Sequence, residues 1–356
     1  MLTYQGRNRA TVNYLKALYF DSPEWTPCRV SLMPATWMKY REDLEEIVLA
    51  HPRIFPGYAK GTQDFDAIPS PLYEAGEHTD CWGIVWNNIE QGLDSIPVVH
   101  PLADWAALAG YTPPDPEIDA QFGPRDWDAA ADALAQAKAR GDIASAGLPH
   151  GFVYMLLYYL RGFENFMIDV ANHDPRLDQV IAFIDHYNLN ATRRFLALGA
   201  EMMSYGEDLG IQHGLPISPA DWRRWIKPSY SRLFGLARER DLPVRLHTDG
   251  YILDIIPDLI ECGVTLLNPQ FRPNGLDGIR EMTSGKLAID LDLDRQLFPF
   301  ATPSEIHDHI GEAHEALYRP EGGLMFYAEC EPDLTLAQIE AVCSGLEATC
   351  RPPLKD

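Results

Sequence analysis

The amino-acid sequence predicts an α/β fold of the (β/α)8-barrel, or TIM-barrel, type with a helical or irregular N-terminal extension. Strand and helix signals alternate from about residue 140 onward. The strand signals are short, continuous apolar runs, which are typical of parallel strands covered by helices. Nearly every run ends in a polar or ionisable residue, as barrel strands do at the mouth where catalytic residues lie.

Six strands are expected in the regular part of the chain: Ile143–Leu148, Met202–Tyr205, Pro243–Leu246, Val264–Leu267, Leu287–Leu291 and Leu324–Ala328. Two earlier candidates, Arg29–Met33 and the weaker Asp64–Ile68, would bring the count to eight. A doubly wound open sheet is the alternative, but no glycine-rich phosphate loop follows the first strand. We therefore expect one domain over residues 1–356, with the extension and the first barrel elements in 1–140 and regular β/α units in 141–356.

The helices expected between these strands carry recognisable start signals. Apolar residues recur at a period near 3.6 within Pro175–Leu198. Ser218 is a good N-cap and is followed by a proline at the first helical position, which predicts a helix as far as residue 240. Thr302–Glu305 repeats this signature, and Thr335–Leu346 is expected to be the last helix.

The composition restricts the classes of partner. Lys and Arg total 29 and Asp and Glu total 52, so the net charge is −23. This charge repels phosphate backbones and anionic lipid head groups, so neither nucleic acid nor a membrane is an expected partner. Six scattered cysteines without a C-x-x-C pair indicate a reducing compartment, and the sequence shows no signal-peptide core and no apolar run of about 18–20 residues. A cytoplasmic location is the expectation.

His247 is the first candidate for a functional role. It follows the strand that ends at Leu246 and precedes Thr248-Asp249-Gly250. Residues two apart in an extended segment point the same way, so His247 and Asp249 should face the mouth together. Gly250 would let the backbone turn sharply there. The alternative is a histidine that is merely hydrogen-bonded at a strand end.

Glu207 and Asp208 follow another expected strand directly. Two adjacent carboxylates in a site of low dielectric repel each other unless a cation or a proton lies between them. We interpret both, with His247 and Asp249, as candidate catalytic residues. The alternative is that one of the two carboxylates points to solvent or caps a helix.

A zinc site can be assembled from residues at separate strand ends. His247, Cys330, Glu207 and Asp249 offer nitrogen, sulfur and oxygen ligands, and a catalytic zinc keeps one position open. No local spacing motif supports this set, because its members come from different strands. A lone buried cysteine is the alternative interpretation of Cys330.

Other strand ends supply candidate substrate-binding residues. These are His150, Asn268, Gln270 and Asp290. Asp290, Asp292 and Asp294 alternate along one expected strand and would share a face. The three aspartates could also be charged residues at the end of the strand that pair with the nearby Arg295.

Several segments, in their order along the chain, resemble the uroporphyrinogen decarboxylase superfamily. They are Phe20–Val30, Asp80–Ile84, Gly206–Gly210 with Ile217–Pro219, Leu246–Gly250, Glu261–Pro269, and Pro320–Gly323 with Glu329–Pro332. The resemblance spans nearly the whole chain. It implies a single barrel domain, an enzymatic activity and a possible homodimer.

The resemblance favours one branch of that superfamily. Porphyrinogen decarboxylases hold their substrate with arginines after the first strand, but here Ser31–Met38 has no arginine and the next one is Arg41. Corrinoid-dependent methyltransferases bind zinc through a His-x-Cys pair and a cysteine on the last strand. His247 and Cys330 are similar to two of these ligands, Asp249 stands where the paired cysteine would be, and Glu207 could complete the set.

The resemblance therefore implies zinc-dependent transfer of a methyl group between a small methylated substrate, such as a methyl ether, and a cobalt corrinoid. The corrinoid would be carried on a separate protein, because the chain lacks the Asp-x-His-x-x-Gly corrinoid-binding motif. A metal-free decarboxylase or lyase acting on a small carboxylated substrate, using Glu207, Asp208 and His247, is the runner-up. A ligand-binding protein without catalysis is the third alternative.

Overall fold

The computed structural model describes residues 1–351 and contains two compact units. Unit one comprises Met1–Val12, Glu77–Asn87 and Ile96–Leu267. Unit two comprises Asn13–Gly76, Asn88–Ser95 and the described chain from Asn268 onward.

The predicted α/β class is confirmed, and seven of the eight expected strands are present. They are β1 (Cys28–Leu32), β5 (Ser145–Gly147), β6 (Met202–Glu207), β7 (Val244–Thr248), β8 (Leu266–Pro269), β9 (Ala288–Asp292) and β10 (Leu324–Cys330). The strand expected at Asp64–Ile68 is wrong, because this segment forms turns. The Asp64 carboxylate accepts the backbone N–H of Asp66 at 3.0 Å. This local bond competes with a strand ladder for the backbone N–H.

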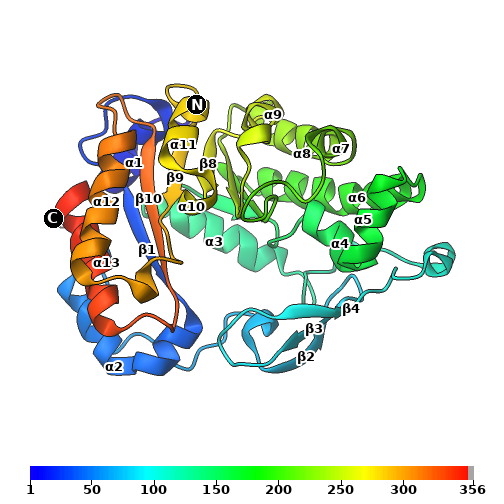
Figure 1. Ribbon diagram of the computed structural model, residues 1–356, viewed down its shortest axis with the longest axis horizontal. Coiled ribbons are helices and arrows are strands. Elements are labelled where there is room, and N and C mark those ends of the chain that lie inside the picture. The colour runs from blue at the N-terminus through cyan, green and yellow to red at the C-terminus, as the bar shows by residue number, and fades with distance from the viewer. Residues whose placement is uncertain (352–356) are drawn as a thin grey trace. The chain divides into compact units, whose positions relative to one another are not determined.

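Unit one is built on the parallel strands β5, β6 and β7, in which Ser145 pairs with Met202 and Met203 pairs with Val244. Its helices are α3 (Trp127–Ala139), α4 (Tyr154–Arg161), α5 (Phe163–Ala171), α6 (Arg176–Ala197), α7 (Pro219–Trp225), α8 (Lys227–Arg238) and α9 (Ile256–Cys262), with short 3-10 turns at Trp105–Gly110 and Leu253–Ile255 (Figure 1). Tyr205 of β6 and Phe234 of α8 pack with ring centroids 5.0 Å apart, which anchors the helix to the sheet.

The helix expected from Ser218 to residue 240 is two helices, so that prediction needs a correction. The Ser218 hydroxyl accepts the N–H of Asp221 at 3.0 Å, and this confirms the predicted cap. Helix α7 ends at Trp225, and α8 begins at Lys227 with Pro228 in its first turn. Proline has no N–H to continue the α7 ladder, so it starts a new helix.

A small antiparallel sheet lies ahead of the regular repeats in the sequence. Its strands are β2 (Gly76–Thr79), β3 (Val85–Asn88) and β4 (Ile96–Val99). The turn between β2 and β3 is organised by the buried Asp80, which accepts the backbone N–H groups of Trp82 at 2.9 Å and Ile84 at 3.0 Å. The rest of the N-terminal region contributes α1 (Arg9–Tyr19), α2 (Pro34–Ala50) and a 3-10 turn at Pro71–Tyr73. The predicted helical or irregular extension is confirmed.

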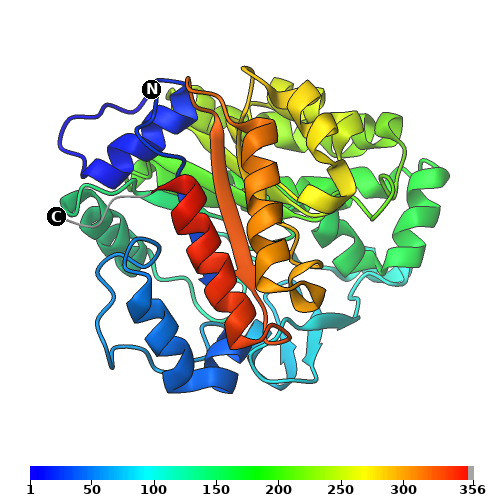
Figure 2. The same cartoon turned by 60° about the vertical axis from the view of Figure 1, so that its left-hand side comes forward.

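Unit two is built on the parallel strands β1, β10 and β9, in which Cys28 pairs with Phe326 and Leu324 pairs with Ile289. Helices α12 (Pro303–Leu317) and α13 (Leu336–Cys350) lie side by side along β10 (Figures 1 and 2). Both begin with capping boxes, at Thr302 as the sequence predicted and also at Thr335. The remaining elements are α10 (Phe271–Asn274), α11 (Leu276–Thr283) and a 3-10 turn at Phe298–Phe300.

Two further properties follow from the described residues. All six cysteines are free thiols. No helix in residues 1–351 combines the length and the apolar character that crossing a bilayer requires.

Candidate functional site

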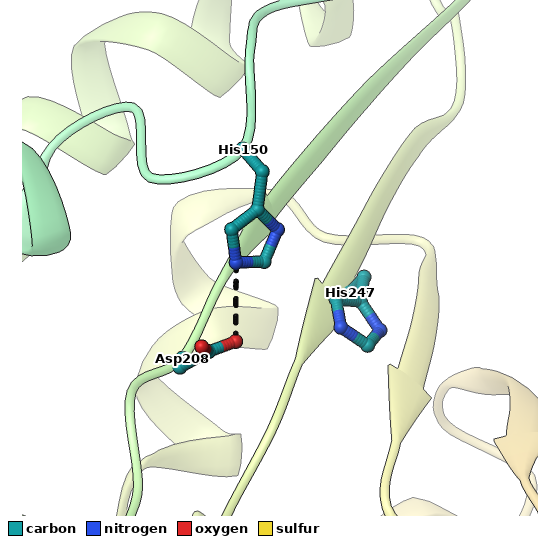
Figure 3. A group of neighbouring side chains, drawn as sticks. All are labelled: His150, Asp208 and His247. Carbon is teal, nitrogen blue, oxygen red and sulfur yellow. Dashed lines mark hydrogen bonds and ion pairs between the residues drawn. The ribbon is translucent and has the colours of Figure 1, made fainter. Parts of the chain in front are cut away.

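Four side chains from strand ends come together in unit one. His150 follows β5, Asp208 follows β6, and His247 and Asp249 lie at the end of β7. The Nε2 atom of His150 is 3.1 Å from Oδ1 of Asp208, and the rings of His150 and His247 are 5.7 Å apart (Figure 3). The Nε2 atom of His247 is 3.4 Å from Oδ1 of Asp249, as expected for residues two apart at a strand end.

Three of these residues have donor atoms close enough to share one metal ion. One ligand atom each from His150, Asp208 and His247 lies within 4.8 Å of the others. The three side chains are 43%, 37% and 19% exposed, so a ligand can reach them. The sequence predicted each of these residues for the site, but it assigned His150 to substrate binding and did not pair it with Asp208.

A glycine on β6 makes room for the His150 ring. A Cβ atom at Gly206 would lie 2.7 Å from Nδ1 of His150, which is closer than real Cβ contacts. The carbonyl of Gly206 also accepts the N–H of Gly151 at 2.8 Å, and this bond fixes the loop that carries His150 to the end of β6. The backbone therefore aims His150 at the neighbouring strand end.

The loops that follow β6 and β7 touch through two other glycines. Gly250 has a φ of 81°, and a Cβ there would lie 2.1 Å from the backbone of Gly210. The N–H of Gly210 donates to the carbonyl of Asp249 at 3.1 Å, and the N–H of Leu209 donates to Oγ1 of Thr248 at 3.1 Å. The sharp turn expected at Gly250 is confirmed, and it holds the two loops together.

Glu207 is fully buried and turns away from the histidines. Its carboxylate accepts the N–H groups at the start of α4, from Val153 at 2.5 Å, Tyr154 at 3.0 Å and Met155 at 3.3 Å, and the hydroxyl of Tyr230 at 2.5 Å. Burial raises the pKa of Glu207 to about 7, although these hydrogen bonds oppose the rise. Its acceptor capacity is committed to the helix, so the contacts favour the helix-capping alternative over the catalytic and metal-binding roles.

The charges around His150 favour its protonated form in the absence of a metal. Burial by itself lowers the pKa of His150. The hydrogen bond to Asp208 and the negative charges of Asp208, Glu207 and Asp249 outweigh this, so the pKa lies above its ordinary value. The strand ends of unit one thus form an anionic environment that attracts a cation, whether proton or metal.

Cys330, the predicted sulfur ligand, belongs to the hydrophobic core of unit two. It has no exposed surface and clusters with apolar residues of β10 and α13, among them Phe326, Val342 and Leu346. Burial raises the pKa of the thiol well above its usual range, with Glu329 adding to the effect. The structure therefore favours a core cysteine, which is the alternative that the sequence left open.

The three predicted substrate-binding residues in unit two are held by local bonds. The Asp290 carboxylate lies 3.3 Å from Nη2 of Arg29. The amide of Asn268 donates to the carbonyl of Asp290, and the carbonyl of Gln270 accepts the amide of Asn274 at 2.9 Å. Nothing in these contacts tests a role in substrate binding, which stays a prediction.

Sequence reasoning missed a pocket beside His150 in unit one. It is small, with a cavity volume of about 30 Å³. Aromatic side chains make up much of the lining, which consists of Asp80, Trp82, Trp86, Gln121, Pro149, His150, Gly151, Phe152, Leu156, Tyr159, Tyr187 and Asn188. The available signal was the polar and aromatic segment Asp80–Ile84, but sequence alone could not bring it to the end of β5.

No protein-family model matches the chain, and no curated protein is similar to it in sequence. Solved structures are similar in fold. A methyltransferase from Methanosarcina mazei superposes with a TM-score of 0.62 at 14% identity, over 95% of this chain and 98% of the other. The chain has the fold of that methyltransferase.

Other solved structures match less of the chain. A B12-independent methionine synthase from Shewanella superposes with a TM-score of 0.42 at 10% identity, over 66% of this chain and 70% of the other. A dihydropteroate synthase from Xanthomonas albilineans has a TM-score of 0.29 at 15% identity, over 53% and 63% of the two chains.

Proposed function

We propose that the chain is a methyltransferase that moves a methyl group from a small methylated substrate, such as a methyl ether, to a corrinoid carried on a separate protein. In this proposal one zinc ion is held by His150, Asp208 and His247. The convergence of these three donor groups in unit one is the observation that carries it. The shared fold with a methyltransferase and the resemblance of the strand-end segments support the reaction class.

The donor set fits zinc in chemistry and spacing. Zinc takes imidazole nitrogen and carboxylate oxygen, and catalytic sites use three protein ligands with one open position. Ligand atoms around a tetrahedral zinc lie about 3.3 Å apart, given metal–ligand distances of about 2.0–2.1 Å. The 3.1 Å between His150 Nε2 and Asp208 Oδ1 is already close to that spacing, and the His247 ring needs only a small movement.

Asp249 has a supporting part in this site. Histidines that bind metal usually donate the N–H of the other ring nitrogen to a carboxylate, which fixes the ring and its tautomer. The 3.4 Å contact between His247 and Asp249 is of this kind. The sequence had placed Asp249 and Glu207 among the metal ligands; in the revised set Asp249 orients His247, and Asp208 supplies the oxygen.

The reaction balances when the corrinoid arrives with reduced cobalt. The electron pair of the cobalt forms the new bond to the methyl carbon, the carbon–oxygen bond breaks, and the departing oxygen takes up a proton. A bound zinc would act as a Lewis acid towards the oxygen that gains negative charge. Asp249 would keep the His247 ring in place for this, and the half-exposed position of His150 leaves the site open to substrate.

Metal analysis of protein purified without added metal tests the proposal. We expect about one zinc per chain in the wild type, and loss of the zinc in His150→Ala and in His247→Ala. His173→Ala is the matched control, because His173 also contacts a carboxylate in unit one, Asp221, at 3.1 Å. It should keep its zinc.

Activity completes the test. Zinc-loaded protein supplied with a reduced corrinoid protein and a methyl ether should yield methylcorrinoid, and the two zinc-deficient variants should not. Folded wild type free of metal would overturn the zinc site. Iron in its place would also overturn it, since two histidines and a carboxylate can bind ferrous iron. Release of carbon dioxide from a carboxylated substrate by the metal-free protein would assign the decarboxylase alternative instead.

A further inference from the structure

Helix α2 in unit two is bent at a strained residue, Arg41. Its φ of 45° and ψ of −121° lie outside the regions that a residue with a side chain readily adopts. These angles are close to those of the first central residue of a type II′ turn, which is normally glycine. Such a conformation costs free energy and persists only where surrounding contacts fix it. The contacts around Arg41 therefore decide whether α2 stays bent.

The local sequence favours a straight helix instead. Residues 35–49 of α2 contain neither glycine nor proline, the residues at which helices usually kink. Arginine is itself a good helix former, so nothing in the local sequence places a bend at Arg41. Local propensity and tertiary contacts thus favour two different conformations of the same helix.

The segment Tyr58–Asp66, which we call the strap, contacts α2 at the bend. The guanidinium of Arg41 donates to the two carboxylate oxygens of Asp66 at 2.8 and 3.2 Å, and it lies 5.3 Å from the centre of the Phe65 ring. Phe65 also stacks with Trp37, which precedes the bend, with ring centroids 5.9 Å apart. The end of the strap therefore holds both the strained residue and the first half of α2.

The strap also holds the half of α2 that follows the bend. The carboxylate of the buried Glu45 accepts the N–H of Gly61 at 2.6 Å and the hydroxyl of Tyr58 at 2.8 Å. Tyr58 in turn stacks with Trp37, with ring centroids 6.3 Å apart. Because the strap contacts both halves of α2, it fixes the angle between them.

The first half of α2 is tied to the loop after β10. The hydroxyl of Thr36 donates to the carbonyl of Cys330 at 2.9 Å, and the hydroxyl of Tyr40 donates to the carbonyl of Leu334 at 2.6 Å. Straightening α2 would turn this half relative to the half that follows Arg41. The loop after β10 must then move with it or lose these hydrogen bonds.

We propose that the strap and α2 form a two-state conformational device. With the strap closed, Arg41 is strained and α2 is bent. With the strap released, Arg41 becomes helical, α2 straightens, and the loop after β10 is displaced. The Arg41 and Asp66 side chains are 44% and 68% exposed, so salt screens their ion pair and favours release. The inference concerns unit two alone and does not depend on the proposed function.

Fluorine NMR of the full chain labelled with 5-fluorotryptophan tests the device. Trp37 reports on the strap because it stacks with Phe65 and Tyr58, and its resonance is assigned with Trp37→Phe. Arg41→Ala removes the ion pair but keeps the strain, so we expect a second Trp37 resonance and a released population at least about tenfold above the wild type. Arg41→Gly also removes the ion pair, but glycine adopts the bent conformation without strain, so the wild-type resonance should remain.

Three further measurements complete the test. Asp66→Asn weakens the ion pair while Arg41 keeps its strain, so it should also populate the released state. About 1 M sodium chloride should increase release in the wild type but not in Arg41→Gly. Hydrogen exchange in the loop after β10 should be faster in Arg41→Ala and unchanged in Arg41→Gly.

Glu46→Gln is the matched control. It removes an exposed ion pair with Lys60 that also joins the strap to α2, away from the bend, and it should leave the Trp37 resonance unchanged. Equal responses of Arg41→Ala and Arg41→Gly would overturn the proposal, because backbone strain would then have no part in release. A single wild-type resonance in both Arg41→Ala and Asp66→Asn would also overturn it, as would a response of Glu46→Gln as large as that of Arg41→Ala.

Discussion

In unit one, the ionisable residues at the ends of β5, β6 and β7 contact one another as histidine–carboxylate pairs, whereas in unit two the acids Asp294 and Glu329, at the ends of β9 and β10, contact arginines. His150 is 3.1 Å from Asp208 in unit one. In unit two, Arg272 is 2.7 Å from Asp294, and Arg295 is 2.5 Å from Glu329. Both units thus gather charge at strand ends, but with different partners.

The partner of each carboxylate decides whether that carboxylate can still bind a metal ion. A guanidinium remains protonated and occupies carboxylate oxygens with fixed N–H donors. An imidazole can lose its proton and then offers a nitrogen lone pair, as a metal ligand must. The acids of unit two are therefore neutralised by the protein itself. Those of unit one retain the capacity to share a cation with the histidines.

The largest expected effect concerns Glu207, which we regard as structural despite its place beside Asp208. Glu207→Ala leaves three backbone N–H groups and the Tyr230 hydroxyl buried without their acceptor. We expect a loss of about 3–5 kcal/mol in the free energy of unfolding, measured by urea denaturation. Asp208→Ala, the matched control, should lose zinc and change stability by less than about 1 kcal/mol. Unchanged stability of Glu207→Ala with loss of zinc would return Glu207 to the metal site.

A pH effect is expected from unit two at His309. Burial lowers the pKa of this side chain to about 4, and its Nε2 atom accepts the N–H of Asp294 at 3.2 Å. Arg272 lowers the pKa further and Asp294 opposes this. Between the unfolded pKa of about 6.5 and the folded value, the unfolded chain binds more protons, so stability falls as the pH falls.

We expect His309 to contribute at most about 3 kcal/mol to the loss of stability between pH 6.5 and pH 4. In His309→Gln, whose amide oxygen can still accept the Asp294 N–H, this loss should be smaller. Denaturation curves at several pH values measure the difference. Equal losses in both proteins would mean that His309 does not control acid stability in this unit.

Gly206→Ala tests whether the geometry of unit one depends on space beside His150. The new methyl group would lie 2.7 Å from Nδ1 of the ring, so His150 must shift. We expect zinc affinity to fall about 10–100-fold, as for changes in the groups that position metal ligands. A metal-buffer titration measures the affinity. Gly214→Ala is the control, since a Cβ there meets nothing within 4 Å; an equal loss in both variants would contradict the steric explanation.

The smallest effect is expected for the arginine-paired acids. Asp290→Asn replaces the ion pair with Arg29 by a neutral hydrogen bond; Asp290 is buried, but the Arg29 side chain is 52% exposed and stays hydrated, so stability should fall by about 1 kcal/mol. Its zinc content should equal that of the wild type. Loss of zinc in this variant would show that unit two takes part in metal binding and would break the contrast between the units.

Much of the local structure was predictable because it depends on short-range chemistry. The apolar runs located seven strands, and the caps at Ser218 and Thr302 located two helix starts. The joint direction of His247 and Asp249 followed from the twofold repeat of a strand. The strand predicted at Asp64–Ile68 was wrong, because the backbone N–H of Asp66 bonds to the Asp64 carboxylate and is not available to a neighbouring strand.

The composition of the site was less predictable. His150 and Asp208 are 58 residues apart in sequence, and no spacing motif relates them. The wall of the aromatic pocket likewise combines Trp86 from β3 with Tyr187 from α6. Contacts between residues of separate elements depend on how those elements pack. No local pattern in a single sequence predicts that packing.

The sequence by itself determined the strand and helix pattern, the charge of −23 and the polar character of the strand ends. Only the tertiary structure decided which of these polar groups meet. Glu207 and Asp208 show the reason: successive side chains on a strand point to opposite sides. One carboxylate is buried against α4 and Tyr230, and its neighbour reaches His150. Two adjacent acids of the same chemistry thus have different roles, because packing around the strand gives each a different partner.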